Sequence, residues 1–247
     1  MTAPEAPEAS SAAVPGISPV AAVVGVFSKP DDTFGRLVKK PTWWLPFVLY
    51  MLAVFGSALV ITPKIDMARS MHEMLSRRGM SDEQIETVIK QQGERSPVAG
   101  AAYGAAGFGV VFLVVGLVFW GSVRAMGAEA RFSQVLAIWG HASLVNVAGT
   151  LVAIPLFLSV PDASMTQKAA GQFVKSNVGA FLPDSWPTFV VSLLSSIDLF
   201  SIACLALLAI GFRKLPELGK GGAIGVTVTL YVLYSLAKAA LAAVFMG

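Results

Sequence analysis

The chain alternates long apolar stretches with short polar ones, a pattern typical of a protein that crosses a membrane several times. A helix needs about 20 residues to cross the hydrocarbon core of a bilayer. The stretches that are long and apolar enough are 43–61, 98–123, 137–160, 187–212 and 223–246. We therefore expect an all-α polytopic membrane domain over residues 43–246 with five transmembrane helices. These stretches lack the apolar–polar alternation of membrane-spanning strands.

The polar segments around the first span predict three further units. Residues 1–19 are rich in Ala, Pro, Ser and Glu without a positively charged start, which indicates a disordered tail rather than a signal peptide. Residues 20–42 predict an amphipathic segment lying on the membrane surface. The first loop predicts a helical hairpin over 64–96, because a capping-box pattern at 81–84 precedes a second set of helically spaced apolar residues. We expect the weak apolar face of this hairpin to pack on its own membrane domain, with partner binding as the alternative.

The residues expected at the membrane interface are Arg36, Lys39, Lys40, Trp43 and Trp44. Lys and Arg counts also bear on orientation, because cytoplasmic loops carry an excess of both. With the amino terminus inside, nine Lys and Arg fall inside and eight outside, a difference too small to decide the orientation. Leaving out the first loop as a folded unit changes the outside count to two. We therefore expect a cytoplasmic amino terminus and a carboxyl terminus outside.

Composition narrows the class of protein further. Over 247 residues, hydrophobic residues make up 55% and charged residues 13%, whereas soluble domains carry about 25% charged residues. This excludes a conventional soluble enzyme, a disordered protein and a nucleic-acid binder that relies on a basic surface. The single cysteine, Cys204, excludes an intramolecular disulfide and a cysteine-cluster metal site.

Two charged residues inside the predicted spans, Asp198 and Lys238, are the main candidates for chemistry. A charge at the centre of a bilayer costs about 2.5–3.5 kcal/mol on insertion scales, so it normally faces protein or water. Counted along adjacent antiparallel helices, both residues lie at one depth, and we expect them to form an intramembrane polar pair. Ser195 and Ser201 flank Asp198 and can complete its hydrogen bonds. The alternatives are a proton or cation relay, or a Lys238 that reaches the interface and leaves Asp198 protonated.

Other motifs are weaker. His141 and Asn146 are supporting polar residues in the third span, and His141 is interpreted as structural rather than as a ligand. Gly100 and Gly104 form a small-xxx-small motif that predicts close helix packing, within the bundle or between copies. No arrangement of nucleophile and base, paired carboxylates or phosphate-binding loop is present. We therefore expect no enzymatic activity, no cofactor and no metal site.

Several short motifs resemble the Yip family of Ypt/Rab-interacting membrane proteins, in its bacterial branch. They are FSKPxxTF at 27–34 with PxWWxPF at 41–47, GAEARFSQVLA at 127–137, and SSIDLFSI at 195–202 with LLAIGF at 207–212. The resemblance covers about residues 27–246 and departs from the family pattern at Ala203 and Cys204, where Trp is frequent. It implies five spans with a cytoplasmic amino terminus in a bacterial inner membrane.

The resemblance implies a fold more firmly than an activity. Eukaryotic members are tied to small GTPases of vesicle traffic, and nothing in this sequence identifies such a partner. We expect a non-enzymatic scaffold or adaptor that binds membrane lipids and other membrane proteins or itself, and no nucleic acid. The alternative is a small transporter or channel component that uses Asp198 and Lys238 along a polar path.

Overall fold

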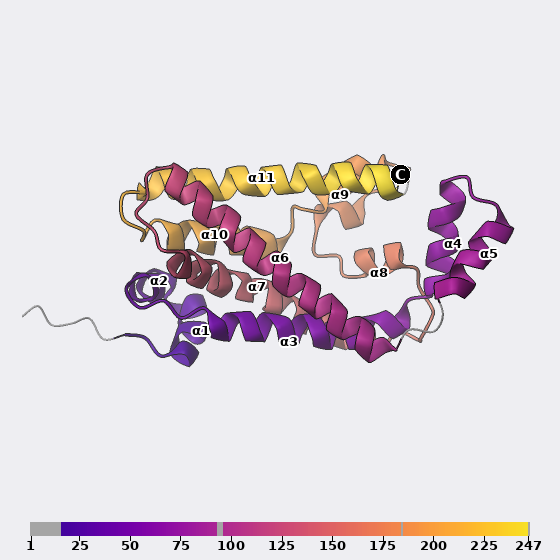
Figure 1. Ribbon diagram of the computed structural model, residues 1–247, viewed down its shortest axis with the longest axis horizontal. Coiled ribbons are helices and arrows are strands. Elements are labelled where there is room, and N and C mark those ends of the chain that lie inside the picture. Colours follow the sequence, from indigo (N-terminus) through magenta and orange to yellow (C-terminus); the bar gives the residue numbers. More distant parts are fainter. Residues whose placement is uncertain (1–15, 93–95, 184, 247) are drawn as a thin grey trace, which may run out of the picture.

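The computed structural model describes residues 16–92, 96–183 and 185–246, and within these ranges it contains helices and no strand. Four of the helices are long and apolar enough to cross a membrane: α3 (Trp44–Ile61), α6 (Pro97–Ala125), α7 (Phe132–Leu158) and α11 (Gly219–Met246). They run lengthwise in an elongated bundle, with α6 crossing the others obliquely (Figure 1). Of the predicted disordered tail at 1–19, residues 1–15 lie outside the described residues.

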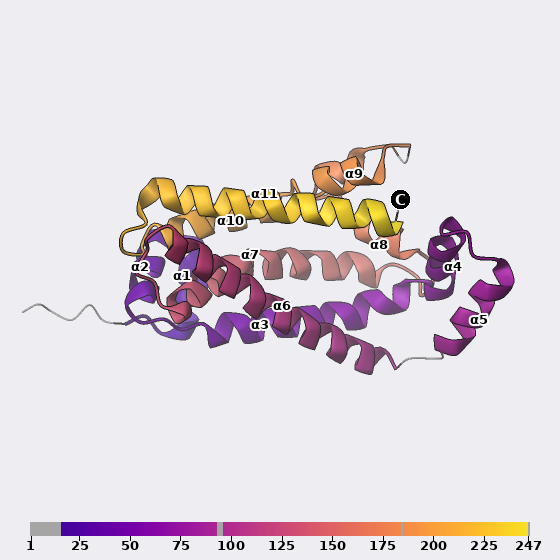
Figure 2. The same cartoon turned by 45° about the horizontal axis from the view of Figure 1, so that its top comes forward.

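The long helices agree with four of the five predicted spans, but the prediction of one continuous span at 187–212 is wrong. Two helices occupy that stretch, α9 (Thr188–Leu194) and α10 (Leu199–Phe212). With 14 residues, α10 is about 21 Å long, less than the roughly 30 Å of a hydrocarbon core. Figure 1 places α10 beside one half of α11 and α9 near the other half, and Figure 2 shows α9 standing out from the bundle.

The amino-terminal segment is part of the bundle. Helices α1 (Pro19–Ser28) and α2 (Pro30–Lys39) form a hairpin, and α2 packs on α7 and α10. Phe34 and Leu37 are fully buried, and the Gln134 side-chain amide donates a hydrogen bond to the Val38 carbonyl at 2.8 Å. The apolar side of α2 therefore faces protein, not the lipid surface that we expected. Helix α1 keeps an exposed apolar side that includes Phe27.

A series of aromatic contacts joins the helices at the centre of the molecule. Phe112 of α6 lies 5.3 Å from Phe47 of α3 and 5.6 Å from Trp139 of α7, measured between ring centroids. Phe119 continues the series, at 5.6 Å from Trp139 and 5.2 Å from Phe212 of α10. Tilted aromatic pairs contribute about 0.5–1.5 kcal/mol each beyond their buried area. These contacts matter in a membrane, where lipid is as apolar as the helix surfaces and packing replaces the hydrophobic effect.

The first loop contains a short 3₁₀ turn, η1 (Thr62–Lys64), and two helices, α4 (Met67–Arg77) and α5 (Asp82–Gln92). As the capping-box pattern predicts, the Ser81 N–H donates to the Gln84 side chain at 3.0 Å and the Gln84 N–H to the Ser81 hydroxyl at 3.4 Å. Leu75 and Ile85 are buried where α4 and α5 pack together. The hairpin therefore closes its apolar face on itself, and it projects beyond the ends of the long helices (Figure 1).

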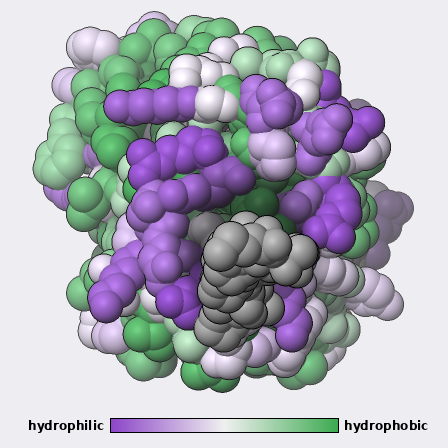
Figure 3. Space-filling view, turned by 90° about the vertical axis from the view of Figure 1, so that its left-hand side faces the viewer, coloured by the Kyte–Doolittle hydropathy of each residue, from purple (hydrophilic) through white to green (hydrophobic). Residues whose placement is uncertain are grey.

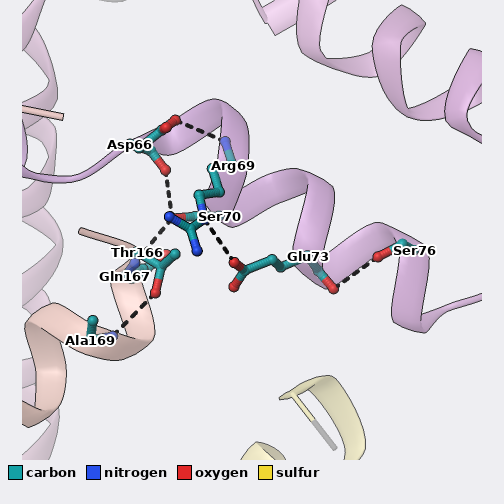
Figure 4. A network of polar contacts seen from close by, with 8 residues as sticks. All are labelled: Asp66, Arg69, Ser70, Glu73, Ser76, Thr166, Gln167 and Ala169. Carbon is teal, nitrogen blue, oxygen red and sulfur yellow. Dashed lines mark hydrogen bonds and ion pairs between the residues drawn. The ribbon is translucent and has the colours of Figure 1, made fainter. Parts of the chain in front are cut away.

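Polar contacts join the hairpin to the segment that precedes α8 (Gln167–Phe173). The Asp66 N–H donates to the Met165 carbonyl at 2.8 Å, and the Gln167 N–H donates to the Ser70 hydroxyl at 3.0 Å. Figure 4 shows the second of these contacts beside the Arg69–Glu73 ion pair on α4. The end of the bundle that carries α4, α5 and α8 is called the hairpin end below. The opposite end, with α2 and the turns after α6 and α10, is called the basic end.

Candidate functional site

The interruption of the fourth apolar stretch is organised by Asp198, which caps the amino terminus of α10. Its carboxylate accepts hydrogen bonds from the N–H groups of Phe200 at 2.9 Å and Ser201 at 3.0 Å, and from the Ser201 hydroxyl. A carboxylate at this position satisfies N–H groups that a helix leaves unpaired and lies at the positive end of the helix dipole. The sequence placed Asp198 at the centre of a continuous helix, and the structure places it at a helix start.

The carbonyl groups exposed by the interruption are also hydrogen-bonded. The Val178 N–H donates to the Ile197 carbonyl at 3.1 Å, and the Tyr231 hydroxyl of α11 donates to the Ser196 carbonyl. Val178 begins the 3₁₀ turn η2 (Val178–Phe181), which packs on α9. Because bilayers offer no water to unpaired backbone groups, such partners are what allow a helix to be interrupted there.

Glycine makes the approach of η2 possible. A Cβ atom added at Gly179 would lie 2.6 Å from the Val191 carbonyl oxygen and 2.9 Å from the Ser195 nitrogen, closer than real side chains come. The Ser195 hydroxyl, one of the predicted supporting groups, donates to the Val191 carbonyl of its own helix at 2.8 Å. Of the two flanking serines, only Ser201 bonds to the carboxylate among the hydrogen bonds of the described residues.

Lys238 lies on α11, half-buried, and is close enough to Asp198 for electrostatic attraction. No ion pair joins the two among the ion pairs of the described residues. The structure therefore directs the Asp198 carboxylate to α10 rather than to the direct pair that we expected. Whether the charge of Lys238 matters to Asp198 at this longer range stays a prediction.

The supporting polar residues of α7 lie apart from the interruption. His141 is fully buried, and its Nδ1 atom is 2.9 Å from the Ala137 carbonyl oxygen. Its Nε2 atom has no hydrogen-bond partner within the part of the chain that the structure describes. Asn146 lies near the buried thiol of Cys204 on α10. His141 therefore bonds within its own helix, and Asn146 faces α10 at Cys204.

The glycines predicted to pack helices are not those that do so. A Cβ atom at Gly100 or Gly104 would meet no atom within 4 Å in the part of the chain that the structure describes. Close approaches occur further along, where a Cβ at Gly109 would lie 3.1 Å from the Met51 sulfur and one at Gly140 would lie 3.1 Å from Pro46. The intramolecular use of Gly100 and Gly104 is therefore wrong, and the alternative, contact between copies, stays untested.

At the basic end, α2 is held by charge as well as by packing. Asp31 forms ion pairs with Lys214 at 2.7 Å and with Arg213, both in the turn after α10. Hydrogen bonds from Lys214 and Arg213 lower the pKa of Asp31 below its ordinary value of 3.8. Of the residues predicted at the membrane interface, Arg36 forms an ion pair with Asp32 at 3.2 Å. Trp43 is half-buried and its ring contacts that of Phe47. The side chains of the other three are exposed: Lys39, Lys40 and Trp44.

These features define a polytopic α-helical membrane protein in which Asp198 and the interrupted backbone around it are hydrogen-bonded within the protein. The chain matches the model of the Yip1 domain over residues 24–241 and belongs to that family. It is similar to the membrane protein YknW of Bacillus subtilis (strain 168), with 24% identity over 196 residues that cover 79% of each chain. No solved structure matches it.

Two contributors to the interruption, Tyr231 and the residues that follow Asn177, were not predicted from the sequence. A phenol near the middle of an apolar helix needs a hydrogen-bond partner, so Tyr231 was a detectable signal. The segment around Val178 carried no such signal, because it contributes only its backbone N–H to the interruption.

Proposed function

We propose that this Yip1-family protein is a non-enzymatic membrane adaptor that uses the α4–α5 hairpin to bind the exposed part of another membrane protein. The observation that carries the proposal is the hairpin itself. It is a folded unit with its own small core, presented beyond the spans and fixed to the bundle at its base. A loop that served only to connect two spans would not need that core or those contacts.

The surface of the hairpin suits recognition of a polar partner. On α5, Glu83 and Glu86 are exposed, and Glu86 pairs with Lys90 at 2.8 Å, a hydrogen bond that lowers the pKa of Glu86. On α4, Met67 and Met74 are partly exposed, at 49% and 38%. Exposed methionines adapt to varied apolar surfaces, and the surrounding charges give orientation.

Site-specific photocrosslinking tests this role. A photoreactive amino acid at Gln91, an exposed position of α5, introduced into the full chain in its native membrane, should give discrete protein adducts identified by mass spectrometry. The matched control at Val114, an exposed apolar position of α6, should give lipid adducts. Exchange of Glu83 and Glu86 for Gln should remove the Gln91 adducts and cost about 0.5 kcal/mol of stability, because it removes the Glu86–Lys90 ion pair without adding a repulsive charge. If Gln91 gives no protein adduct or the exchange has no effect on the adducts, the hairpin is not the binding surface.

A second candidate, transport along a path containing Asp198 and Lys238, is favoured by the interruption between α9 and α10. Discontinuous helices in transporters hold ions with unwound carbonyls and helix ends. Here, however, the Ser196 and Ile197 carbonyls and the Asp198 carboxylate already accept hydrogen bonds from the protein. Ion and solute flux in proteoliposomes decides: flux that Asp198→Asn abolishes would favour transport over the adaptor role.

A further inference from the structure

A hollow of about 330 Å³ opens on the basic end, between the last turn of α6 and the first turn of α7. Arg124, Glu129 and Arg131 line it with residues of the connecting turn, and all three side chains are exposed. None of the three takes part in an ion pair within the described part of the chain. By contrast, Arg36, Arg213 and Lys214 at the same end are paired with acids.

The backbone around the hollow is held in place. The Gly127 N–H donates to the Arg124 carbonyl at 3.0 Å and the Ala128 N–H to the Val123 carbonyl at 3.0 Å, a Schellman arrangement that requires the positive φ of 90° at Gly127. The Trp120 indole N–H donates to the Ala130 carbonyl at 3.0 Å, and Ala130 is buried. The lining side chains therefore project from a fixed frame rather than from a loose loop.

The charges of the hollow match one kind of ligand. Guanidinium groups bind phosphate through several charge-assisted hydrogen bonds, whereas a carboxylate repels phosphate and binds an ammonium group. Two arginines and one glutamate therefore complement a group that carries both a phosphate and a primary ammonium.

The surroundings favour a lipid as the carrier of that group. Tryptophan is enriched at the level of lipid headgroups, and Trp120 borders this turn. Phe132 and Met126, at 37% and 48% exposure, offer apolar surface next to the hollow. Figure 3, which views the basic end, shows hydrophilic residues gathered over the middle of this face and apolar residues mainly at its rim. We propose that Arg124, Arg131 and Glu129 form a binding site for the headgroup of an aminophospholipid, with the arginines on its phosphate and Glu129 on its ammonium.

Native mass spectrometry of the purified full chain tests the site, which does not depend on the adaptor role. The probes are phosphatidylethanolamine, phosphatidylcholine and phosphatidylglycerol with the same acyl chains. Phosphatidylethanolamine should bind about tenfold more tightly than phosphatidylcholine, whose quaternary ammonium cannot donate the charge-assisted hydrogen bond to Glu129. Equal binding of these two lipids, or preference for phosphatidylglycerol, would overturn the assignment of the ammonium.

Variants separate the two halves of the site. Glu129→Gln should reduce phosphatidylethanolamine binding to the level of phosphatidylcholine, and Arg124→Gln with Arg131→Gln should weaken the binding of both lipids. The control, Lys39→Gln with Lys40→Gln, removes equal charge at the same end and should leave binding unchanged. A loss of the same size in this control would show general attraction and overturn the site. Displacement of the lipid by an equal concentration of inorganic phosphate would show a free-phosphate site instead.

Discussion

Asp198 accepts hydrogen bonds from the N–H groups that begin α10. Asp198→Ala should lower the free energy of unfolding by about 1–2 kcal/mol, because the N–H groups of Phe200 and Ser201 lose their acceptor. Asp198→Asn keeps a capping oxygen and should cost about 0.5 kcal/mol or less, since Asn and Asp are similar caps. Thermal unfolding in one detergent, followed by tryptophan fluorescence, measures both.

Lys238→Met is the matched control for that comparison. It should change stability little if Asp198 acts as a cap. Equal losses for Asp198→Asn and Asp198→Ala, matched by Lys238→Met, would instead show that charge attraction between the two residues holds this region together.

Asp31 predicts a pH-dependent attachment of α2. Because its pKa in the folded protein lies below the ordinary value of 3.8, its ion pairs stabilise the fold above pH 3.8 and are lost as the pH falls through the lowered pKa. Asp31→Asn should therefore lower the melting temperature at neutral pH, and the difference from the wild type should vanish in acid. Asp32→Asn, whose partner Arg36 lies on the same helix, should have a smaller effect. A difference that persists below the lowered pKa would contradict this role of Asp31.

At the scale of elements, α2 behaves as a core helix. Phe34 is fully buried, and a Cβ atom at Gly211 of α10 would lie 3.2 Å from its ring. Phe34→Ala should cost about 3–5 kcal/mol, the usual loss for a buried phenylalanine. Phe27→Ala, at a side chain that is 53% exposed, should leave the fold intact. Similar melting temperatures for the two variants would indicate that α2 lies on the lipid surface after all.

The contact between η2 and α9 makes a second prediction for an element. Gly179→Ala should destabilise the protein by about 1–3 kcal/mol, because the new methyl group meets the backbone of α9, which cannot move as a side chain can. Gly171→Ala in α8 should be neutral or slightly stabilising, since nothing lies within 4 Å of the added atom. Melting temperatures of the two alanine variants provide the measurement, and a neutral Gly179→Ala would mean that η2 is not seated as described.

Hydropathy predicts the long helices well and fails at the interruption for a physical reason. A window average over 187–212 is dominated by leucine, isoleucine and phenylalanine, and one aspartate hardly lowers it. The helix can stop before Asp198 only because Val178 and Tyr231 donate hydrogen bonds to the Ile197 and Ser196 carbonyls, and hydropathy does not reveal these two donors.

For α2, helical periodicity reveals an apolar face, but lipid and protein are equally apolar partners for it. The same limit applies to Gly100 and Gly104, which have the packing motif without a neighbour.

At the scale of the whole molecule, charge differs between the two ends. Nine Lys and Arg and four acids lie at the basic end: Lys29, Arg36, Lys39, Lys40, Arg124, Arg131, Arg213, Lys214 and Lys220, with Asp31, Asp32, Glu129 and Glu217. At the hairpin end, cations are balanced locally, as in the pairs Arg69–Glu73, Lys90–Glu86 and Lys64–Asp162. With the α4–α5 hairpin left out of the count as a folded unit, the basic end carries the excess of Lys and Arg that is typical of cytoplasmic loops.

This asymmetry predicts that the basic end faces the cytoplasm and the hairpin faces outward. The native chain suits a direct test, because its single cysteine, Cys204, is buried and should not react with a thiol reagent in the folded protein. Glu83→Cys and Lys220→Cys each add one exposed thiol, at the hairpin end and the basic end respectively. A membrane-impermeant maleimide applied to intact spheroplasts should label Glu83→Cys at once and Lys220→Cys only after the membrane is opened. The reverse labelling pattern would show the opposite orientation and place the aminophospholipid site in the outer leaflet. Labelling of both variants in intact spheroplasts would show a mixed orientation, which contradicts the prediction from the charge asymmetry.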